Sequence, residues 1–202
     1  MTALAFVLAL AGGYLLGSIP FGLVFTRMAG LGDVRAIGSG NTGATNVLRT
    51  GNKLVAFLTL LADIGKATVP MVAAFLVLRS LEAAYVAGFG AFLGHLFPVW
   101  LRFKGGKGIA CFVGVTLGVG IVAGNWWGLV VFAVAWLGVA FTLRISSAAG
   151  LTATLLTPLA YWLTGAPGAA LLLLVMGAIS WVSHRANIGR LWAGTEPRIG
   201  AK

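Results

Sequence analysis

Long hydrophobic runs without charged side chains alternate with short polar stretches along the whole chain. Residues 1–26 form the first run, and further runs cover about 54–78 and 83–101. About 20 consecutive apolar residues suffice for a helix that crosses the hydrocarbon core of a membrane. The pattern therefore predicts an all-α membrane protein, with a kink at Pro20 near the end of the first helix.

Two longer uncharged runs are expected to fold back on themselves. Residues 108–143 would form a single helix of about 54 Å, against a hydrocarbon core of about 30 Å. A break at 124–126 divides this run into two helices, and a break at 164–168 divides the run 145–183 in the same way. The sequence therefore predicts a polytopic protein with seven transmembrane helices, forming a single domain over residues 1–202.

The composition supports this class. The mean hydropathy is +1.00 and only 9% of the residues are charged, against roughly a quarter in soluble domains. A net charge of +10 could suggest nucleic-acid binding, but the basic residues lie between hydrophobic runs and no soluble domain carries them. Cys111 is the single cysteine, so no internal disulfide can form, and no metal-ligand cluster or cofactor motif is visible in the sequence. We expect membrane lipids and anionic ligands as partners, no nucleic acid, and a monomer.

The distribution of basic residues predicts the orientation. Twelve of the fourteen lysines and arginines, Lys202 among them, fall on one side of the predicted membrane. Arg79 lies on the opposite side, and Lys66 lies within the second helix. Cytoplasmic loops carry the excess of basic residues in polytopic proteins. The count therefore places the N-terminus outside and the C-terminus in the cytoplasm.

The stretch 38–49 is small and polar in an otherwise hydrophobic chain. It contains three glycines, two asparagines, three hydroxyl side chains and a closing Arg49. Glycine lets backbone N–H groups approach an anion, and the arginine fork matches phosphate oxygens. A flexible loop between two membrane helices would have a similar composition. Both interpretations stay open on this stretch alone.

Two further stretches on the predicted cytoplasmic side have the same character. Segment 102–108 combines basic side chains with glycines, and segment 184–190 combines two arginines with His, Asn and Gly. The positive-inside bias predicts the basic residues but not the small polar residues around them. A phosphorylated, lipidic substrate at the membrane surface explains both. A nucleotide-binding P-loop is disfavoured, because Gly108 follows Lys107 where that motif needs Ser or Thr.

Several polar residues in the helices have two interpretations. Asp63 and Lys66 lie three residues apart on one helix face, where they could form a structural ion pair or a wall of the polar site. His184 could be a structural hydrogen-bonding residue or a base, and Asn187 lies one helical turn further on. For His95 we favour a structural role.

Four motifs, taken in order along the chain, carry a resemblance to a known family. They are Gly-Ser-Ile-Pro-Phe-Gly at 17–22, Gly-Ser-Gly-Asn-Thr-Gly-Ala-Thr-Asn-Val-Leu-Arg at 38–49, Gly-His-Leu-Phe-Pro at 94–98 with Phe-Lys-Gly-Gly-Lys-Gly at 103–108, and His-Arg-Ala-Asn-Ile-Gly-Arg at 184–190 with Gly-Thr-Glu at 194–196. Together they resemble the bacterial acyl-phosphate-dependent glycerol-3-phosphate acyltransferases. One departure is Ala186, where a charged residue is expected.

The resemblance implies a seven-helix enzyme of the bacterial inner membrane with its active site at the cytoplasmic face. Such an enzyme transfers a fatty acyl group from acyl phosphate to the 1-hydroxyl of glycerol 3-phosphate. The products are lysophosphatidic acid and inorganic phosphate, in the first step of phospholipid synthesis. The alternative is a transporter or flippase for phosphorylated solutes or lipids. The polar pair within the second helix would suit a transporter, whereas the crowding of polar residues at one face favours the enzyme.

The resemblance also implies roles for individual residues. The family's functional serine and arginine fall on Ser39 and Arg49, its histidine and asparagine on His184 and Asn187, and its structural glutamate on Glu196. Its phosphate-binding lysine and glycines fall on the segment from Lys104 to Gly108.

The chemistry of the residues suggests how these roles would be divided. We expect cationic side chains to hold the phosphates, glycines to give backbone donors, and neutral polar groups to orient glycerol 3-phosphate. His184 would accept the hydroxyl proton, or would only orient the substrate while a phosphate oxygen takes that proton. The expected catalytic residues are Ser39, Arg49, Lys104, His184 and Asn187, and the expected binding residues are Gly40, Asn41, Gly43, Asn46, Gly105, Gly106, Lys107 and Gly108.

Overall fold

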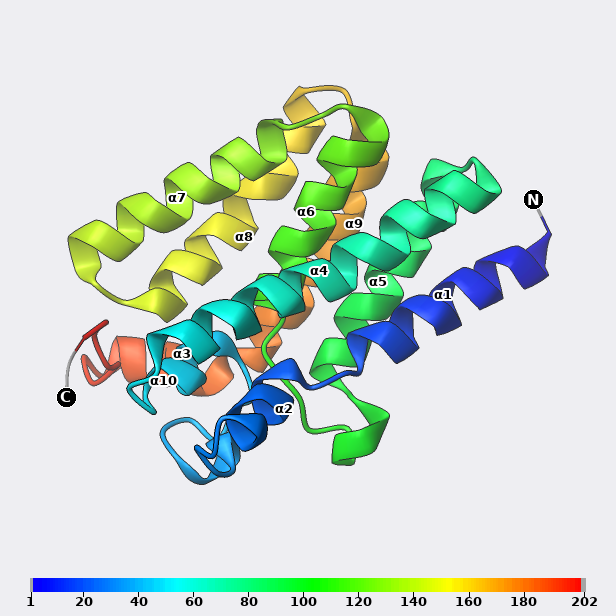
Figure 1. Ribbon diagram of the computed structural model, residues 1–202. Helices are drawn as coiled ribbons and strands as arrows, with labels where there is room; N and C mark the ends of the chain where they lie inside the picture. Colours follow the sequence, from blue (N-terminus) through cyan, green and yellow to red (C-terminus); the bar gives the residue numbers. More distant parts are fainter. Residues whose placement is uncertain (1, 201–202) are drawn as a thin grey trace. The chain divides into compact units, whose positions relative to one another are not determined.

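The computed structural model describes residues 2–200, so Lys202 lies outside the described residues. Within this range the chain forms helices and connecting loops, and no strand is present (Figure 1). The ten α-helices and two short 3₁₀ helices of this range are α1 Ala3–Gly17, α2 Phe21–Met28, η1 Val34–Ala36, α3 Ala44–Leu48, α4 Lys53–Leu78, α5 Leu81–Leu96, η2 Val99–Leu101, α6 Ile109–Ala123, α7 Trp127–Leu143, α8 Ser146–Leu163, α9 Pro167–Ser183 and α10 Arg185–Trp192.

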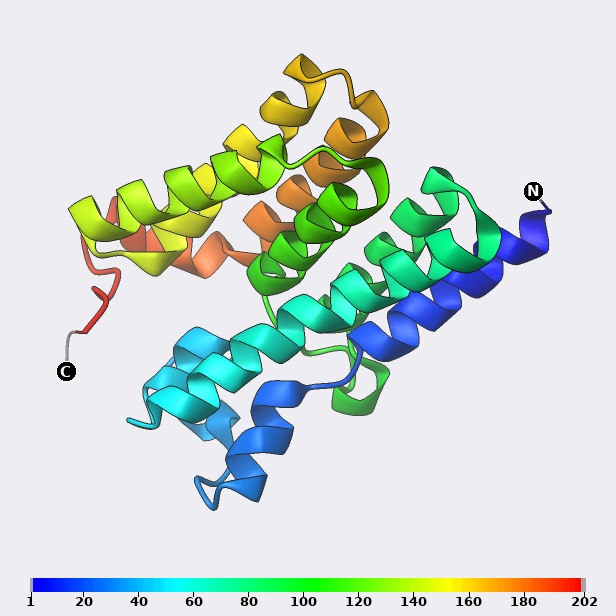
Figure 2. The ribbon, with the colours of Figure 1, turned by 45° about the horizontal axis from the view of Figure 1, so that its top comes forward.

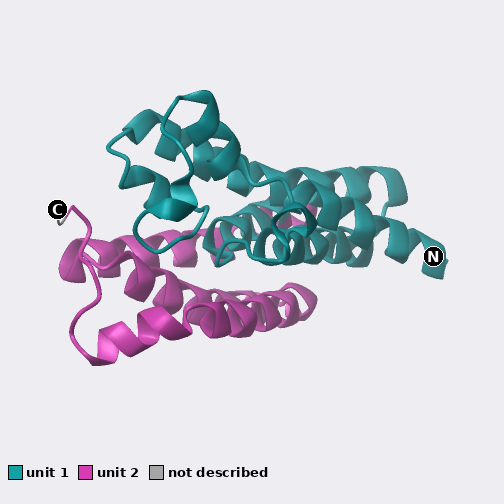
Figure 3. Ribbon diagram, turned by 90° about the horizontal axis from the view of Figure 1, so that it is seen from below, with its two compact units in different colours: residues 1–118 teal, residues 119–202 magenta. Residues whose placement is uncertain are grey.

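The chain divides into two compact units, residues 1–118 and 119–202 (Figure 3). The boundary falls within α6, so the first unit holds α1 to α5 and most of α6, and the second holds α7 to α10. The polar stretches 38–49 and 102–108 belong to the first unit, and 184–190 belongs to the second.

Small residues determine the packing in the first unit. In Figures 1 and 2, α1 lies beside α5, and the two backbones meet at glycines. A Cβ at Gly13 or Gly17 would lie 2.0 Å from a carbonyl oxygen of α5, and one at Gly90 or Gly94 would lie 2.2–2.3 Å from a carbonyl oxygen of α1. Both helices therefore carry glycines four residues apart at the contact. Small residues at this spacing allow close approach in lipid, as the high glycine content of the sequence predicts.

The polar segment after α2 is folded onto α4. Its core consists of Val34, Val47, Val55 and Ala56, with Phe25 and Leu31 packed against it. Gly22 of α2 allows this segment to come close, since a Cβ there would lie 1.9 Å from the carbonyl oxygen of Thr42. The stretch 38–49 is thus a packed structure with a short helix, α3, rather than an extended flexible loop.

In the second unit the end of α6 is followed by the hairpin of α7 and α8, which lie side by side in Figures 1 and 2. Gly128 at the start of α7 contacts the Tyr161 ring, because a Cβ there would lie 2.0 Å from Cε2. The chain then turns into α9, and α10 follows at an angle of 64°. Beyond α10, the Ile199 amide donates to the Arg144 carbonyl at 2.5 Å.

The predicted breaks are all present. The first helix is interrupted between Gly17 and Phe21, next to Pro20, and the later breaks at 124–126 and 164–166 separate α6 from α7 and α8 from α9. Within residues 2–200, three helical segments are long and apolar enough to cross a membrane: Ala3–Met28, Lys53–Leu78 and Leu81–Leu101. The bent pair of α9 and α10 would make a fourth, and α6 and α7 are shorter apolar helices.

Candidate functional site

Asn46 holds the polar loop of the first unit together. Its side chain is 2% exposed, and its amide nitrogen donates to the carbonyl oxygens of Val34, Ile37 and Asn41 at 2.8–3.1 Å. Its side-chain oxygen accepts from the Ser39 amide at 3.1 Å. All of its polar atoms are therefore used within the loop. Asn46 is thus part of the frame of the loop, and its expected role in orienting substrate stays a prediction.

The same frame places Ser39 and Arg49 at the surface. Gly38 has φ +54°, and a Cβ there would lie 2.4 Å from the Asn46 side-chain oxygen and 2.6 Å from Cδ of Arg49. Only glycine fits both this backbone conformation and this close packing. The side chains of Ser39 and Arg49 are exposed, as the expected roles of these residues require.

Four glycines of the two loops donate their N–H groups to oxygens of the protein itself. We expected four of these groups to face a phosphate, but each donates to an oxygen of the protein at 2.9–3.1 Å: Gly40 to Ile37, Gly43 to Asn41, Gly105 to Leu96 and Gly106 to His95. In this structure these four N–H groups are used within the protein, and their contact with a phosphate stays a prediction. Of these four glycines only Gly106 is buried, and a buried backbone N–H group needs a partner within the protein. The glycines instead allow close packing: at Gly108, where φ is +91°, a Cβ would lie 2.3 Å from the Phe92 ring.

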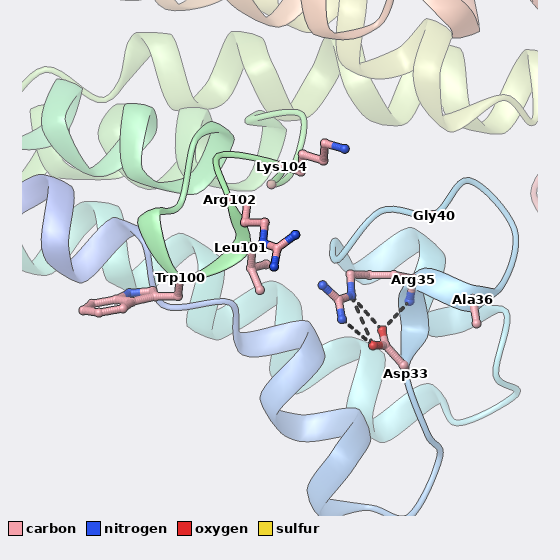
Figure 4. Close-up of a pocket in the computed structure, with 9 residues that line it drawn as sticks. Asp33, Arg35, Ala36, Gly40, Trp100, Leu101, Arg102 and Lys104 are labelled. Atoms are coloured by element: carbon pink, nitrogen blue, oxygen red, sulfur yellow. Dashed lines mark hydrogen bonds and ion pairs between the residues drawn. The ribbon is translucent and has the colours of Figure 1, made fainter.

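A pocket of about 660 Å³ lies between the two loops of the first unit. Figure 4 shows Arg35 and Arg102 extending toward the same space from different loops. The pocket is lined by Asp33, Arg35, Ala36, Gly40, Trp100, Leu101, Arg102, Lys104 and Gly105. Three of these residues are cations and one is an acid. The pocket thus brings together Gly40, Lys104 and Gly105 of the predicted site.

The side chains that line the pocket carry a net positive charge. Arg35 donates through Nε to Oδ1 of Asp33 at 2.9 Å and through Nη2 to Oδ2 at 2.5 Å, and Arg27 lies 3.5 Å from the same carboxylate. The side-chain hydrogen bond from Arg35 holds the pKa of Asp33 well below its ordinary value, and the same bond raises the pKa of Arg35. Both groups therefore stay charged at neutral pH. One acid cannot balance three cations, so Arg102 and Lys104 leave the pocket suited to an anion.

In the second unit, Glu196 gathers the polar residues of the last motif. Its Oε1 accepts from Ser147 Oγ at 2.6 Å and from Asn187 Nδ2 at 2.5 Å. Its Oε2 accepts from Arg190 Nε at 2.7 Å. Burial raises the pKa of Glu196, but these hydrogen bonds outweigh it and lower the pKa below its ordinary value. Glu196 therefore connects the start of α8 to α10 and orients the Asn187 amide.

His184 lies at the corner between α9 and α10. It is 4% exposed, and Nδ1 lies 2.8 Å from the Ser180 carbonyl oxygen. A carbonyl oxygen can only accept, so Nδ1 carries the proton and Nε2 is the proton-accepting nitrogen of the neutral ring. Asn187, one turn further on, is 6% exposed.

A buried polar cluster lies in the first unit. Lys66 Nζ lies 2.7 Å from Asp63 Oδ1 and donates to the Ile19 carbonyl at 2.8 Å. His95 Nδ1 lies 3.8 Å from the same carboxylate oxygen. The ion pair considered from the sequence therefore forms, with both side chains 3% exposed.

Sequence reasoning missed three contributors to these sites. Arg35 lies three residues before the predicted stretch, Arg102 was noted only as part of a basic cluster, and Ser147 lies at the start of a hydrophobic helix. The two arginines could have been found from the sequence, because each is a basic residue beside a glycine-rich stretch. Nothing in the sequence points to Ser147. Among residues 2–200, no group of three or more His, Cys, Asp or Glu side chains could hold a metal ion.

Known proteins are similar to this chain in sequence and in fold. Residues 7–194 match the family described as glycerol-3-phosphate acyltransferase. Relatives of that name from Mesorhizobium japonicum and Sinorhizobium medicae are 58% and 60% identical, over 97% and 94% of this chain and 97% and 90% of theirs. A crystal structure of PlsY (YgiH), an integral membrane glycerol 3-phosphate acyltransferase, in its glycerol 3-phosphate form has a TM-score of 0.87 at 35% identity and covers 96% of each chain. Its lysophosphatidic acid form has a TM-score of 0.85 at 34% identity, over 96% of this chain and 95% of that chain. The chain belongs to the glycerol-3-phosphate acyltransferase family.

Proposed function

We propose that this protein transfers a fatty acyl group from acyl phosphate to the 1-hydroxyl of glycerol 3-phosphate. The products would be lysophosphatidic acid and inorganic phosphate. Membership of the acyltransferase family supports acyl transfer to glycerol 3-phosphate. The observation that carries the choice of donor is the pocket, in which Arg35, Arg102 and Lys104 surround a space beside the exposed Trp100. A cationic pocket with an aromatic rim suits a phosphate that is attached to a lipid chain.

The proposed setting is the bacterial inner membrane. Seven spans, an outside N-terminus and a cytoplasmic C-terminus would place all three polar stretches at the cytoplasmic face, where soluble glycerol 3-phosphate is available. The excess of basic residues on that side supports the orientation. The protein would act as a monomer and without a metal or a cofactor.

An acyl phosphate is already activated, so no covalent acyl-enzyme is needed. The hydroxyl oxygen of glycerol 3-phosphate would attack the acyl carbonyl carbon, and the bond from that carbon to the phosphate oxygen would break. Inorganic phosphate would leave with its phosphorus–oxygen bonds intact. The hydroxyl proton would pass to Nε2 of His184 or to a phosphate oxygen. The protein's task is then to position two phosphates and to stabilise developing negative charge.

Four cations of the polar stretches are suited to this task, of which Arg49, Arg102 and Lys104 are exposed and Lys107 is half-buried. Arg49, Lys104 and Lys107 would hold the phosphates, together with Arg102 at the pocket. Ser39 and Asn187 would orient glycerol 3-phosphate, with Asn187 held by Glu196.

The proposal is tested by phosphate release from palmitoyl phosphate with purified protein in lipid. We expect release that depends on glycerol 3-phosphate, is matched by lysophosphatidic acid, and is lost in Arg49→Ala. Residual turnover in His184→Ala would assign the proton to a phosphate oxygen. Folded wild-type protein that binds glycerol 3-phosphate but releases no phosphate would refute the proposed reaction.

A further inference from the structure

The glycine-rich loop 104–108 rests on the C-terminal end of α5. The Gly105 amide donates to the Leu96 carbonyl at 3.0 Å, and the Gly106 amide donates to the His95 carbonyl at 2.9 Å. A Cβ on Gly106 would lie 1.9 Å from Nε2 of His95, 2.4 Å from Cε1 and 2.7 Å from Cδ2. The Gly106 backbone therefore lies directly against the imidazole ring, with no room for a side chain between them.

The ring is also buried on the side that faces α4. His95 is 6% exposed, and its Nδ1 lies 3.8 Å from the Asp63 carboxylate. That carboxylate is paired with Lys66, which also donates to the backbone carbonyl of Ile19. The buried ring therefore lies between the loop and the Asp63 carboxylate of α4, and it occupies the space next to Gly106.

We propose that His95 is a positioning residue, which sets the place of Lys104 and Lys107 through its contact with Gly106. This inference rests on the proposed function, because it assigns those lysines to substrate phosphates. His95 itself touches no reacting atom in this scheme. Its effect is geometric: a displacement of about 1 Å in a group that positions substrate can cost about 100-fold in rate.

The first variant is Gly106→Ala, which adds a methyl group where the ring stands. Ordinary contact begins at 3.4 Å, so the loop or the ring would have to move by about 1.5 Å. We expect kcat/KM for acyl transfer from palmitoyl phosphate to glycerol 3-phosphate to fall by about 100-fold. His95→Ala alone, which leaves the loop without its support, should lose about tenfold.

The decisive variant combines the two changes. In His95→Ala with Gly106→Ala the ring is absent and the methyl group fits, so the double variant should recover to the level of His95→Ala alone. Gly105→Ala is the matched control, because its Cβ would lie 2.1 Å from the His95 carbonyl oxygen, which truncation of the side chain does not remove. His95→Ala should therefore fail to rescue Gly105→Ala. Gly65→Ala, whose Cβ would meet nothing within 4 Å, should retain wild-type activity.

Separate kcat and KM values for both substrates, with unfolding temperatures in the same lipid, complete the test. Rescue of Gly106→Ala only, with unfolding temperatures that do not follow the activities, would support the positioning role. Losses that multiply in the double variant, rescue of both glycine variants, or activities that follow the unfolding temperature would overturn it. Wild-type protein without glycerol-3-phosphate-dependent turnover would refute the proposed function instead.

Discussion

The carboxylate of Glu196 offers the most direct test of how the last motif is held. Glu196→Gln keeps the shape of the side chain, removes its charge and replaces one oxygen with an amide NH₂ group. In the wild-type protein, one oxygen accepts from Ser147 and Asn187 and the other accepts from Arg190. Whichever way the glutamine amide turns, its NH₂ group faces a donor.

The expected cost follows from these contacts. A hydrogen bond to a charged group contributes about 1.5–3 kcal/mol. The Arg190 side chain is 39% exposed, so water replaces much of its ion pair, and that pair adds about 0–1 kcal/mol. We therefore expect Glu196→Gln to reduce the free energy of opening of segment 185–199 by about 2–3 kcal/mol.

Amide hydrogen exchange of segment 185–199 measures this free energy. Each 1.4 kcal/mol corresponds to about a tenfold change in an equilibrium constant, so protection should fall by about 30- to 150-fold. Glu82→Gln is the control, because Glu82 accepts a local hydrogen bond from Ser80, two residues before it, and belongs to the other unit. Unchanged protection in Glu196→Gln, within twofold of wild type, would show that these hydrogen bonds do not hold the segment.

The pH dependence has a definite sign. The pKa of Glu196 is lowered in the folded protein from its ordinary value of 4.5. A lowered pKa means that the carboxylate stabilises the segment fully above pH 4.5, and that this contribution is lost as the pH falls through the lowered pKa. Wild-type protection should therefore decrease in acid toward that of Glu196→Gln, whereas the protection of the variant should lack this transition.

Three further predictions concern the first unit. Lys66→Met leaves the buried Asp63 carboxylate unpaired and should lower the free energy of unfolding by about 3–5 kcal/mol. Denaturant unfolding in detergent should show that adding Asp63→Asn restores part of this free energy. Asn46→Ala leaves the buried Val34 carbonyl without its side-chain donor, which costs about 1–3 kcal/mol. Proteolysis within residues 33–49 should therefore accelerate while α4 stays protected. Arg102→Gln removes a cation from the pocket and should raise KM for palmitoyl phosphate about tenfold, and an unchanged KM in steady-state phosphate release would remove Arg102 from the proposed donor site.

Hydrophobic runs predicted the helices well because run length and helix breakers are local properties. Residues 108–143 had to break since one helix would be too long, and α6 ends and α7 begins beside the predicted segment 124–126. The kink at Pro20 follows from the chemistry of proline alone. Motif composition singled out the polar stretches 38–49 and 102–108, and residues of both line the pocket.

The roles of single residues were harder to predict because they depend on contacts between distant segments. Asn46 and Ser39 have similar hydrogen-bonding chemistry, yet one is buried in the loop frame and the other is exposed. Glycine was read as a source of N–H donors, whereas Gly106 is required by the position of the His95 ring. Neither distinction is present in the sequence, since both arise from which atoms the fold brings within a few ångströms.

In the first unit, two polar side chains of the long apolar helices donate to backbone carbonyls at helix ends. A break in a helix leaves backbone carbonyls without their usual donors, which is costly away from water. At the break after α1, Lys66 donates to the Ile19 carbonyl at 2.8 Å, and beyond the end of α5, the Tyr14 hydroxyl donates to the Phe97 carbonyl at 2.7 Å. Each donor lies on a neighbouring helix, and each carbonyl lies just beyond the end of a helix, Ile19 after α1 and Phe97 after α5. Lys66 is thus explained by the backbone that it stabilises, without a path for a transported solute.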